Sequence, residues 1–471
     1  MKPSVLRFLG TSGIILTFLP GCVLTGPMRN PIFTSAEAVP VARAGFGTPF
    51  IIQAQAVMPA RDTTMIEGSP VVSSKVLTEH DVVDQVLARN PTLEQMTAAW
   101  QAATQRIPQA TSWDDPMLMG AVAPSSFGSN AVDPGYRIEL SQKIYFPGKL
   151  RLKGENASAE ARASENDLED MRVQLAEAAR LAFYDYYLSD RALLVNDEGL
   201  KLLDEFRKNA DARFKAGQVP QQDLFQADVE IGKQKERRFT LQRIQSVARA
   251  RINTLMHLPS ASPLPLPVDA KPQVMSLPSL DSLQSQAIQN RPDLKALADR
   301  IEAEDAAYRL ARREYYADFE VSGAYDSIMG NGPARDLAPQ VAVKMNLPVR
   351  LAKRRAAVHE SLYKIAQKRA ELAARTDQVN FQVQEAFEQL MESDKVLKLY
   401  DSNILPSARA NKDAAQAAYT TGKTPFVTLI EAERNYVELK DRYYMAVADY
   451  FRRQANLDRA IGAAGQSIHR P

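Results

Sequence analysis

The sequence is poor in cysteine and aromatic residues and has almost no net charge. Cys22 is the only cysteine among 471 residues, so no disulfide bond can form within one chain. Aromatic residues make up only 7% of the chain, which favours long helices over a large sheet. The 58 basic residues nearly balance the 56 acidic ones, and no basic tail or patch stands out. This balance argues against a nucleic-acid-binding protein.

Patterns of catalytic or metal-ligating residues are missing as well. The chain has no Ser-His-Asp order, no phosphate-binding loop and no paired-carboxylate motif. Its histidines are scattered without the spacing of metal ligands, and they are His80, His257, His359 and His469. We therefore expect no enzyme, no metal site and no cofactor.

Long apolar runs are confined to the N-terminus. Lys2 and Arg7 lead into an apolar stretch over 9–19 that is too short to span a bilayer. The residues Leu19-Pro20-Gly21-Cys22 then resemble a bacterial lipobox. We predict a signal peptide over 1–21 and acylation of Cys22, with an ordinary signal peptide and an incidental cysteine as the alternative.

The segment after Cys22 is rich in proline, glycine, serine and threonine up to residue 76, which predicts an extended tether over 22–76. No later run of about 18 apolar residues exists, so we expect no transmembrane helix there. An acyl chain on Cys22 would anchor the N-terminus, but firm anchoring takes a second chain or a second contact.

The rest of the chain is an internal duplication. NPTL (90–93) returns as RPDL (291–294) and YFPGKL (145–150) as NLPVRL (346–351), both 201 residues later. This predicts two structural repeats. Their bounds are 77–258 and 280–465, with a proline-rich linker over 259–279 and a C-terminal tail over 466–471.

Each repeat begins with two helices, continues through two strand-like stretches and ends in a long helical hairpin. The expected leading helices cover 79–89 and 92–113, then 281–290 and 293–314. No proline occurs from Leu150 to Phe214, so one helix of roughly 100 Å is expected there. The helices at 92–113 and 221–258, stacked end to end, match its length and are expected to run beside it.

Glycine and proline separate the two arms of each hairpin. Gly217 suits a left-handed helix stop and Pro220 the first turn of the next helix, and Gly422 and Pro425 repeat this arrangement. Pro406 predicts a kink in the second long helix.

Lateral packing is indicated by a coiled-coil seam. Apolar residues follow a 3-4 spacing at Leu429, Ala432, Tyr436, Leu439, Tyr443, Ala446 and Tyr450. The core of a soluble bundle would show the same periodicity, so the seam leaves open whether the bundle is solid or hollow.

The strand-like stretches alternate between apolar and polar residues. From Tyr136 to Ile144 one face is mostly apolar and the other charged, and 341–346 repeats the pattern in the same register. The expected partners are Met117–Ala123 and Phe319–Tyr325. This alternation is typical of membrane β-barrel strands, although an amphipathic hairpin over a soluble core would also show it. Aromatic residues stand at the helix-side ends: Trp113, Tyr145, Phe146, Tyr315 and Tyr316.

Four strands cannot close a barrel, and open sheet edges are not tolerated in lipid. If these strands lie in a membrane, several chains must share one barrel.

Together these motifs resemble the TolC-like outer membrane efflux proteins, in the branch anchored by an acylated cysteine. The similarity covers about 77–463 and rests on SQKIYFPGK (141–149), RFKAGQVPQQDLFQA (213–227) and AAYTTGKTPFVTLIEAE (417–433). One departure is Ala317, where many relatives have proline. The segment NLPVRLAKRRAAVHE (346–360) is similar to members that serve heavy-metal exporters.

The resemblance implies an α+β membrane protein that forms a homotrimer. Long antiparallel helical hairpins would build a periplasmic helical barrel, and four strands per chain would contribute to a 12-stranded β-barrel. The protein would be a passive exit duct in the outer membrane of a Gram-negative bacterium. Its partners would be outer membrane lipid, a periplasmic adaptor (membrane fusion) protein and an inner-membrane transporter of the RND type.

The resemblance also implies roles for residues at the two helical turns. The tips that contact the adaptor would be formed by Phe214, Gly217, Val219, Pro220, Tyr419, Gly422 and Pro425. Asp223 and Glu431 match carboxylates that constrict the tube in relatives, while Thr428 replaces an acid, and Lys423 is a candidate partner for them. The alternative is that the tip residues are only helix caps and the carboxylates only helix-start charges.

A second class of function also accounts for the long helices. A periplasmic coiled-coil adaptor or scaffold would have them, but would not need alternating strands with aromatic ends. Neither the transported substrate nor the open or closed state of the tube follows from the sequence.

Overall fold

The computed structural model describes residues 76–123, 135–270, 272, 277–328 and 339–463. The predicted signal peptide, the acylated Cys22, the tether up to residue 75 and the tail from 466 lie outside the described residues. The account below concerns the described residues alone.

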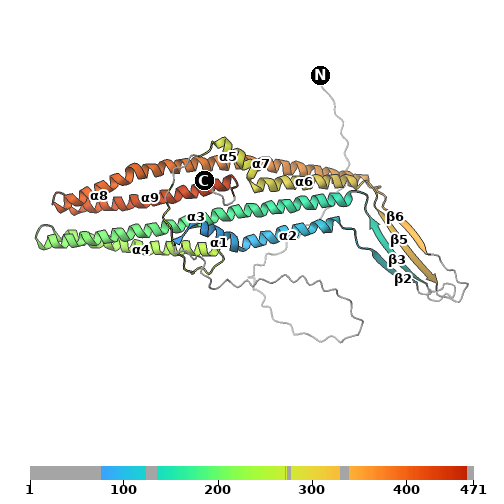
Figure 1. Cartoon of the computed structure of the whole chain (residues 1–471), viewed down its shortest axis with the longest axis horizontal. Coiled ribbons are helices and arrows are strands. Elements are labelled where there is room, and N and C mark those ends of the chain that lie inside the picture. Colours follow the sequence, from blue (N-terminus) through green and yellow to red (C-terminus); the bar gives the residue numbers. More distant parts are fainter. Residues whose placement is uncertain (1–75, 124–134, 271, 273–276, 329–338, 464–471) are drawn as a thin grey trace, which may run out of the picture. The chain divides into compact units, whose positions relative to one another are not determined.

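The described elements follow one order twice (Figure 1). The first set is α1 (Glu79–Arg89), α2 (Pro91–Thr111), β2 (Met117–Ala123), β3 (Gly135–Ile144), α3 (Lys149–Lys215) and α4 (Gln221–Leu255). The second set is α5 (Leu280–Asn290), α6 (Pro292–Arg313), β5 (Phe319–Ile328), β6 (Gln340–Met345), α7 (Leu351–Leu399), η1 (Tyr400–Ile404), α8 (Leu405–Thr420) and α9 (Phe426–Ala460). The leading helices begin and end within two residues of their predicted bounds.

Local capping explains where the first helices begin. Thr78 and Asp81 form a capping box at the start of α1, in which each side chain bonds to the other residue's backbone N–H. Asn90 caps α2 by accepting from the Thr92 N–H, while its Nδ2 donates to the Leu255 carbonyl at the end of α4. The Asn-Pro opening therefore both starts a helix and ties it to the end of the hairpin.

The 67-residue helix α3 is the central element of the structure. It contacts α2 and α4, which confirms that these two helices lie along it in succession, and it also contacts α6 and α9 of the second repeat (Figure 1). Because α3 starts shortly after β3 and ends at the first helical turn, about 100 Å of helix separates the strands from that turn.

A π-helical turn precedes Pro406, the residue at which the sequence predicts a kink. The residues Tyr400–Ile404 form η1, and the Leu405 N–H donates to the Tyr400 carbonyl five residues back. Pro406 has no N–H to offer the carbonyl of Ser402, so an ordinary α-helical bond is missing there. The wider turn accommodates this missing donor within a continuous helical path.

Two short strands join the beginning of the first repeat to the linker. Residues Val76–Leu77 (β1) pair in parallel with Leu266–Pro267 (β4). The buried Leu77 then belongs to the same core as Phe183 and Tyr187 of α3. The proline-rich linker is therefore attached to the middle of α3, which its composition did not predict.

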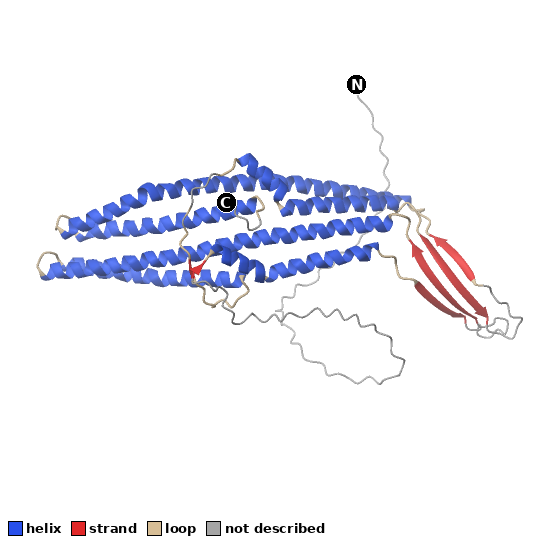
Figure 2. Ribbon diagram, viewed as in Figure 1, coloured by secondary structure: helices blue, strands red, loops and turns tan. Residues whose placement is uncertain are grey.

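The other four strands form one antiparallel sheet in the order β2-β3-β5-β6 (Figure 2). Both predicted hairpins are confirmed, and β5 extends three residues beyond its predicted end. The pairing of β3 with β5, which begins with Ile144 opposite Phe319, joins the two repeats in one sheet. Strands β2 and β6 are its edges.

The exposure of the two sheet faces is inverted relative to a soluble protein. Ile138, Leu140, Val341 and Val343 share the apolar face, and Val341 is 81% exposed. On the opposite face Glu139 is only 5% exposed, and it bonds to the side chains of Arg137 and Lys344. Apolar exposure on this scale marks a surface that meets lipid or another protein.

The predicted seam on α9 is only partly buried in the single chain. Leu429, Ala432 and Tyr450 are buried, but Tyr436 and Tyr443 are half-buried. Residues beside the seam, including Val437, Val447 and Ala448, are buried instead. The helix therefore packs across a wider stripe than a two-helix seam requires.

Candidate functional site

The turns between α3 and α4 and between α8 and α9 share one backbone motif. Gly217 and Gly422 have φ values of 71° and 73°, which confirms the predicted left-handed stops. In both turns the residue after the glycine donates its N–H five residues back, from Gln218 to Arg213 and from Lys423 to Ala418. Pro220 and Pro425 lie one residue before their helices, as N-caps rather than in the first turn.

The structure exposes most of the tip residues singled out from the sequence. Phe214 is 38% exposed, and the two glycines and two prolines of the turns are also exposed, while Val219 is half-buried. Tyr419 differs, because only 3% of it is exposed. Its side chain faces the interior of the chain instead of presenting a surface at the tip.

Tyr419 joins the two hairpins to each other. Its hydroxyl donates to Asp223 Oδ2 on α4 at 3.4 Å, and its carbonyl accepts from the Arg213 guanidinium on α3. The Arg213 guanidinium also lies 4.8 Å from the centre of the Tyr419 ring. On the other side the ring packs against Phe426 of α9 at 5.3 Å. We call Arg213, Tyr419, Asp223 and Phe426 the tip cluster, and it includes one residue from each hairpin helix.

Burial is the main influence on the pKa values of Asp223 and Tyr419 in the tip cluster. It raises the pKa of Asp223, and the hydrogen bond from Tyr419 and the charge of Arg213 oppose this effect. Burial and the neighbouring Asp223 carboxylate raise the pKa of Tyr419. Tyr419 is therefore a neutral hydrogen-bond donor at physiological pH. Arg213, not the Lys423 considered from the sequence, is the cation beside Asp223.

Sequence reasoning missed Arg213 and Phe426 as partners in this cluster. Both residues lie inside the motifs that carried the resemblance, one residue before Phe214 and one after Pro425. A sequence signal is therefore present, since Arg213 and Phe426 each adjoin a residue already singled out at one of the two turns. Their mutual contact depends on how the two hairpins pack.

Glu431 lies away from the tip cluster, on an exposed position of α9. It lines a cavity of about 290 Å³ between α4 and α9, together with Phe225, Val229 and Ile430. Glu230 and Arg434, which form an ion pair, also line this cavity. The structure therefore brings Asp223 and Glu431 to the same end of the chain, but in different surroundings.

A third carboxylate in this region was not singled out from the sequence. Glu433 on α9 is buried, and its Oε2 has no hydrogen-bond partner among the described residues. Burial raises the pKa of Glu433 to about 7, although the charges of Lys412 and Lys440 oppose the shift. Asp413 adds a repulsion that raises this pKa further.

We expect the Glu433 carboxyl to make the chain more stable at low pH. Its pKa rises from 4.5 to about 7 on folding, so between these values the folded state holds a proton that the unfolded state has released. This contribution is complete below pH 4.5 and is lost as the pH rises through 7, with a size of roughly 3 kcal/mol. Glu433→Gln should make the stability depend less on pH. The measurement is the urea concentration at the unfolding midpoint, compared between pH 5 and pH 8.

The exposed Glu438 on the same helix supplies the control, since Glu438→Gln should leave the pH dependence unchanged. Equal pH slopes for the wild-type chain and Glu433→Gln would contradict the assignment.

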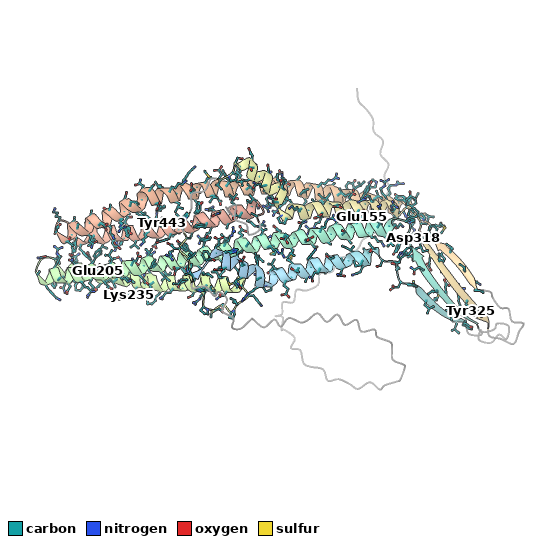
Figure 3. The ribbon with its side chains drawn as sticks, in the orientation of Figure 1. Glu155, Glu205, Lys235, Asp318, Tyr325 and Tyr443 are labelled. Carbon is teal, nitrogen blue, oxygen red and sulfur yellow. The ribbon has the colours of Figure 1, made fainter. Side chains whose placement is uncertain are left out.

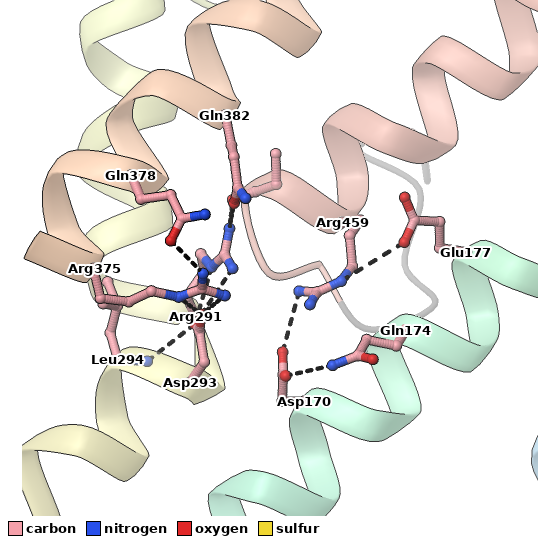
Figure 4. A network of polar contacts seen from close by, with 11 residues as sticks. Asp170, Gln174, Glu177, Arg291, Asp293, Leu294, Arg375, Gln378, Gln382 and Arg459 are labelled. Atoms are coloured by element: carbon pink, nitrogen blue, oxygen red, sulfur yellow. Dashed lines mark hydrogen bonds and ion pairs between the residues drawn. The ribbon is translucent and has the colours of Figure 1, made fainter.

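Two groups of ion pairs lie between the tips and the strands, one within the second repeat and one between the repeats (Figure 4). The buried Arg291 forms a two-bond pair with Asp293, and Arg375 of α7 bonds to the same carboxylate. Nearby, Arg459 of α9 lies 3.1 Å from Asp170 of α3. The first group joins the start of α6 to α7 within the second repeat. The Arg459–Asp170 pair joins the end of α9 to α3, so the relative positions of the two hairpins depend on it.

The described residues contain no group of three or more histidine, cysteine, aspartate or glutamate side chains arranged to hold a metal ion. Among the same residues, no helix is both long and apolar enough to span a membrane. Side chains project from the helices along their whole length, as Figure 3 shows.

Comparison with known proteins relates this architecture to a family. The family model of outer membrane efflux proteins matches residues 283–463. The matched residues are nearly the whole of the second repeat. This match confirms the resemblance that the motifs indicate.

Solved structures extend the likeness to the first repeat. The open state of the MtrE outer membrane channel of Neisseria gonorrhoeae matches with a TM-score of 0.70 and 17% identity, over 85% of this chain and 94% of that chain. The outer-membrane channel OprN matches with a TM-score of 0.69 and 20% identity, over 82% of this chain and 89% of that chain. CusC, described as forming a transmembrane channel, matches with a TM-score of 0.68 and 14% identity, over 85% of this chain and 95% of that chain. At these identities the matches establish a shared fold. No curated protein sequence matches the chain.

Proposed function

We propose that this chain is the outer membrane channel of a tripartite efflux system. It is a passive exit duct for small molecules or ions, coupled to an inner-membrane pump of the RND type through a periplasmic adaptor. The observation that carries the proposal is the inverted sheet, whose apolar face is exposed while Glu139 is enclosed on the other face. The efflux domain over 283–463 supports the same function.

Trimer formation follows from the edges of the sheet. Strands β2 and β6 each present an unpaired row of backbone groups, which lipid cannot satisfy. Three chains that pair β6 of one with β2 of the next would form a closed barrel of 12 strands. The helical hairpins of the same three chains would then surround a tube through the periplasm.

We expect the purified chain to migrate as a heat-modifiable trimer in detergent, because the barrel leaves no free edge once three chains are joined. The measurement is chemical cross-linking and gel migration with and without boiling. A chain that remains monomeric in a membrane-like environment would contradict the channel proposal. Extraction of membranes with alkaline carbonate distinguishes the channel from the alternative function. A coiled-coil adaptor or scaffold would be released into the soluble fraction, whereas a barrel would stay in the membrane.

The N-terminus supplies a second membrane contact in this proposal. Acylation of Cys22 would attach the first residue of the mature chain to the outer membrane, beside the barrel. Cys22→Ala should remove the lipid mass from the N-terminal peptide in mass spectrometry, while the chain stays membrane-bound through its barrel. Complete release of Cys22→Ala into the soluble periplasm would show that the strands do not insert.

The tips are proposed to meet the adaptor. Phe214 and the turn residues Gly217, Val219, Pro220, Gly422 and Pro425 offer a mostly exposed surface for it. The buried Tyr419 would act indirectly, by holding the two hairpins at a set distance. Asp223 and Glu431 would supply negative charge where the tube narrows. Metal ions are one class of cargo, suggested by the segment at 346–360.

A further inference from the structure

A cavity of about 420 Å³ lies in the middle of the helical region, far from the tips. It is bounded by α3, the linker, the junction of α7 with η1, and α9, where Figure 3 labels Tyr443. Its charged and aromatic lining residues are Tyr187, Asp269, Asp394, Lys398, Asp401, Tyr443 and Tyr444. Both repeats and the linker contribute to it, so an occupant would touch all three.

The carboxylates around the cavity differ in how they are neutralised. Asp394 pairs with Lys398 at 2.6 Å, one turn along α7. Asp269 accepts from the Tyr187 hydroxyl at 3.3 Å and lies 3.5 Å from Arg191. Asp401 has neither a hydrogen bond nor an ion pair among the described residues. Among the described residues, Asp401 is therefore the carboxylate of this cavity that has no paired cation.

Aromatic rings form the other part of the wall. Tyr443 and Tyr444 are in edge contact, with ring centres 5.4 Å apart, and Tyr187 is fully buried. Burial and the nearby Asp401 raise the pKa of Tyr443, so its phenol stays neutral. Neutral rings beside a carboxylate attract cations through their π faces. Arg191 already uses Tyr187 in this way, at 5.4 Å from its ring centre.

The π-helical turn η1 places Asp401 in the wall of the cavity. Asp401 is the second residue of η1, and the wider turn changes the direction in which residues 400–404 leave the helix. Single π-turns inside long helices often occur at functional sites. Here the turn supplies Asp401 to the cavity, and Pro406 explains why a π-turn is tolerated at that point.

We propose that this cavity binds a monovalent organic cation, an alkylammonium or quaternary ammonium group, between Asp401 and the rings of Tyr443 and Tyr444. A bare metal ion is a poorer occupant, because the described residues hold no cluster of three or more ligating side chains. The volume lies within the range of small-molecule pockets, of about 300 to 1,000 Å³. The site is separate from the proposed tube constriction at the tips.

The test uses the full-length chain in detergent and a matched pair of probes. Choline carries a quaternary ammonium group, and 3,3-dimethylbutan-1-ol has nearly the same shape without the charge. Calorimetric titration should detect binding of choline but not of the neutral alcohol, and added salt should weaken it. Equal binding of the two probes, or no binding of choline at on the order of 10 mM, would overturn the proposal.

Variants then locate the site. Asp401→Asn and Tyr443→Leu should each weaken choline binding by about tenfold or more, while Tyr443→Phe retains the ring and most of the affinity. Matched controls are Asp413→Asn and Tyr363→Leu, which alter exposed residues outside the cavity. Asp401 is exposed and unpaired, so Asp401→Asn remains informative even if Tyr443→Leu does not fold. Unchanged affinity in Asp401→Asn would overturn the proposal. None of these measurements depends on channel activity.

Discussion

The double substitution Asp223→Ala and Glu431→Ala should lower the cation preference of the channel and raise its conductance. Three copies of each carboxylate would place a ring of negative charge at the narrow end of the trimer, and such a ring attracts cations. Removing Asp223 also removes the hydrogen bond that joins α4 to Tyr419. That bond contributes about 1 kcal/mol per chain, a modest value because its length is 3.4 Å.

Single substitutions separate the two effects. Tyr419→Phe removes the hydroxyl that bonds to Asp223 but leaves the ring on Phe426 and beside Arg213. It should raise conductance several-fold without moving the reversal potential, because no charge changes. The double carboxylate variant should change both quantities. Planar bilayer recordings under a salt gradient measure them together.

A charge-matched control comes from the same two helices. Asp228 on α4 pairs with Arg207, and Glu438 on α9 pairs with Arg442, both on the surface. Asp228→Ala with Glu438→Ala removes the same charge from α4 and α9 outside the tip cluster. If this control shifts the reversal potential as much as the Asp223 and Glu431 variant does, the constriction assignment is wrong.

Val343→Arg should prevent stable insertion of the barrel. Val343 lies on the exposed apolar face of β6, opposite Val321 of β5. An arginine facing lipid near the bilayer midplane costs about 2 to 4 kcal/mol, and the proposed trimer would carry three of them. The fraction of the chain that resists carbonate extraction should fall sharply, together with the heat-modifiable trimer band.

The neighbouring residue supplies the control for this prediction. Ala342 is also exposed, but it pairs with Ser322 on the opposite, polar face. Ala342→Arg introduces the same side chain one residue away, where it would face the lumen. Insertion of the two variants to the same extent would mean that the apolar face does not meet lipid.

Short-range sequence patterns are sufficient to predict the helices and strands and their order along the chain. The absence of proline from Leu150 to Phe214 predicted a helix observed over 149–215, and alternation from Tyr136 to Ile144 predicted a strand that ends at Ile144. Gly217 and Gly422 were recognised as left-handed stops because few other residues adopt that conformation without strain. Each of these inferences depends on interactions within a few residues of the chain.

The tertiary structure determined the contacts between distant segments. Sequence placed Asp223 and Tyr419 at two separate turns, and only the packing of four helices brought them to 3.4 Å with Arg213 alongside. The same holds for the pairing of β3 with β5 and for the attachment of the linker through β4. Such contacts join residues that are tens to hundreds of positions apart, which no local periodicity encodes.

Neighbouring residues are enough to specify a duplicated chain of long helices and amphipathic strands, because helix and strand propensity act over short stretches. The burial of Tyr419, the pairing of Asp223 across two hairpins and the π-turn before Pro406 become known only from the folded chain. The physical reason is that burial and pairing depend on which helices meet. In this protein α3 meets helices of both repeats along its length.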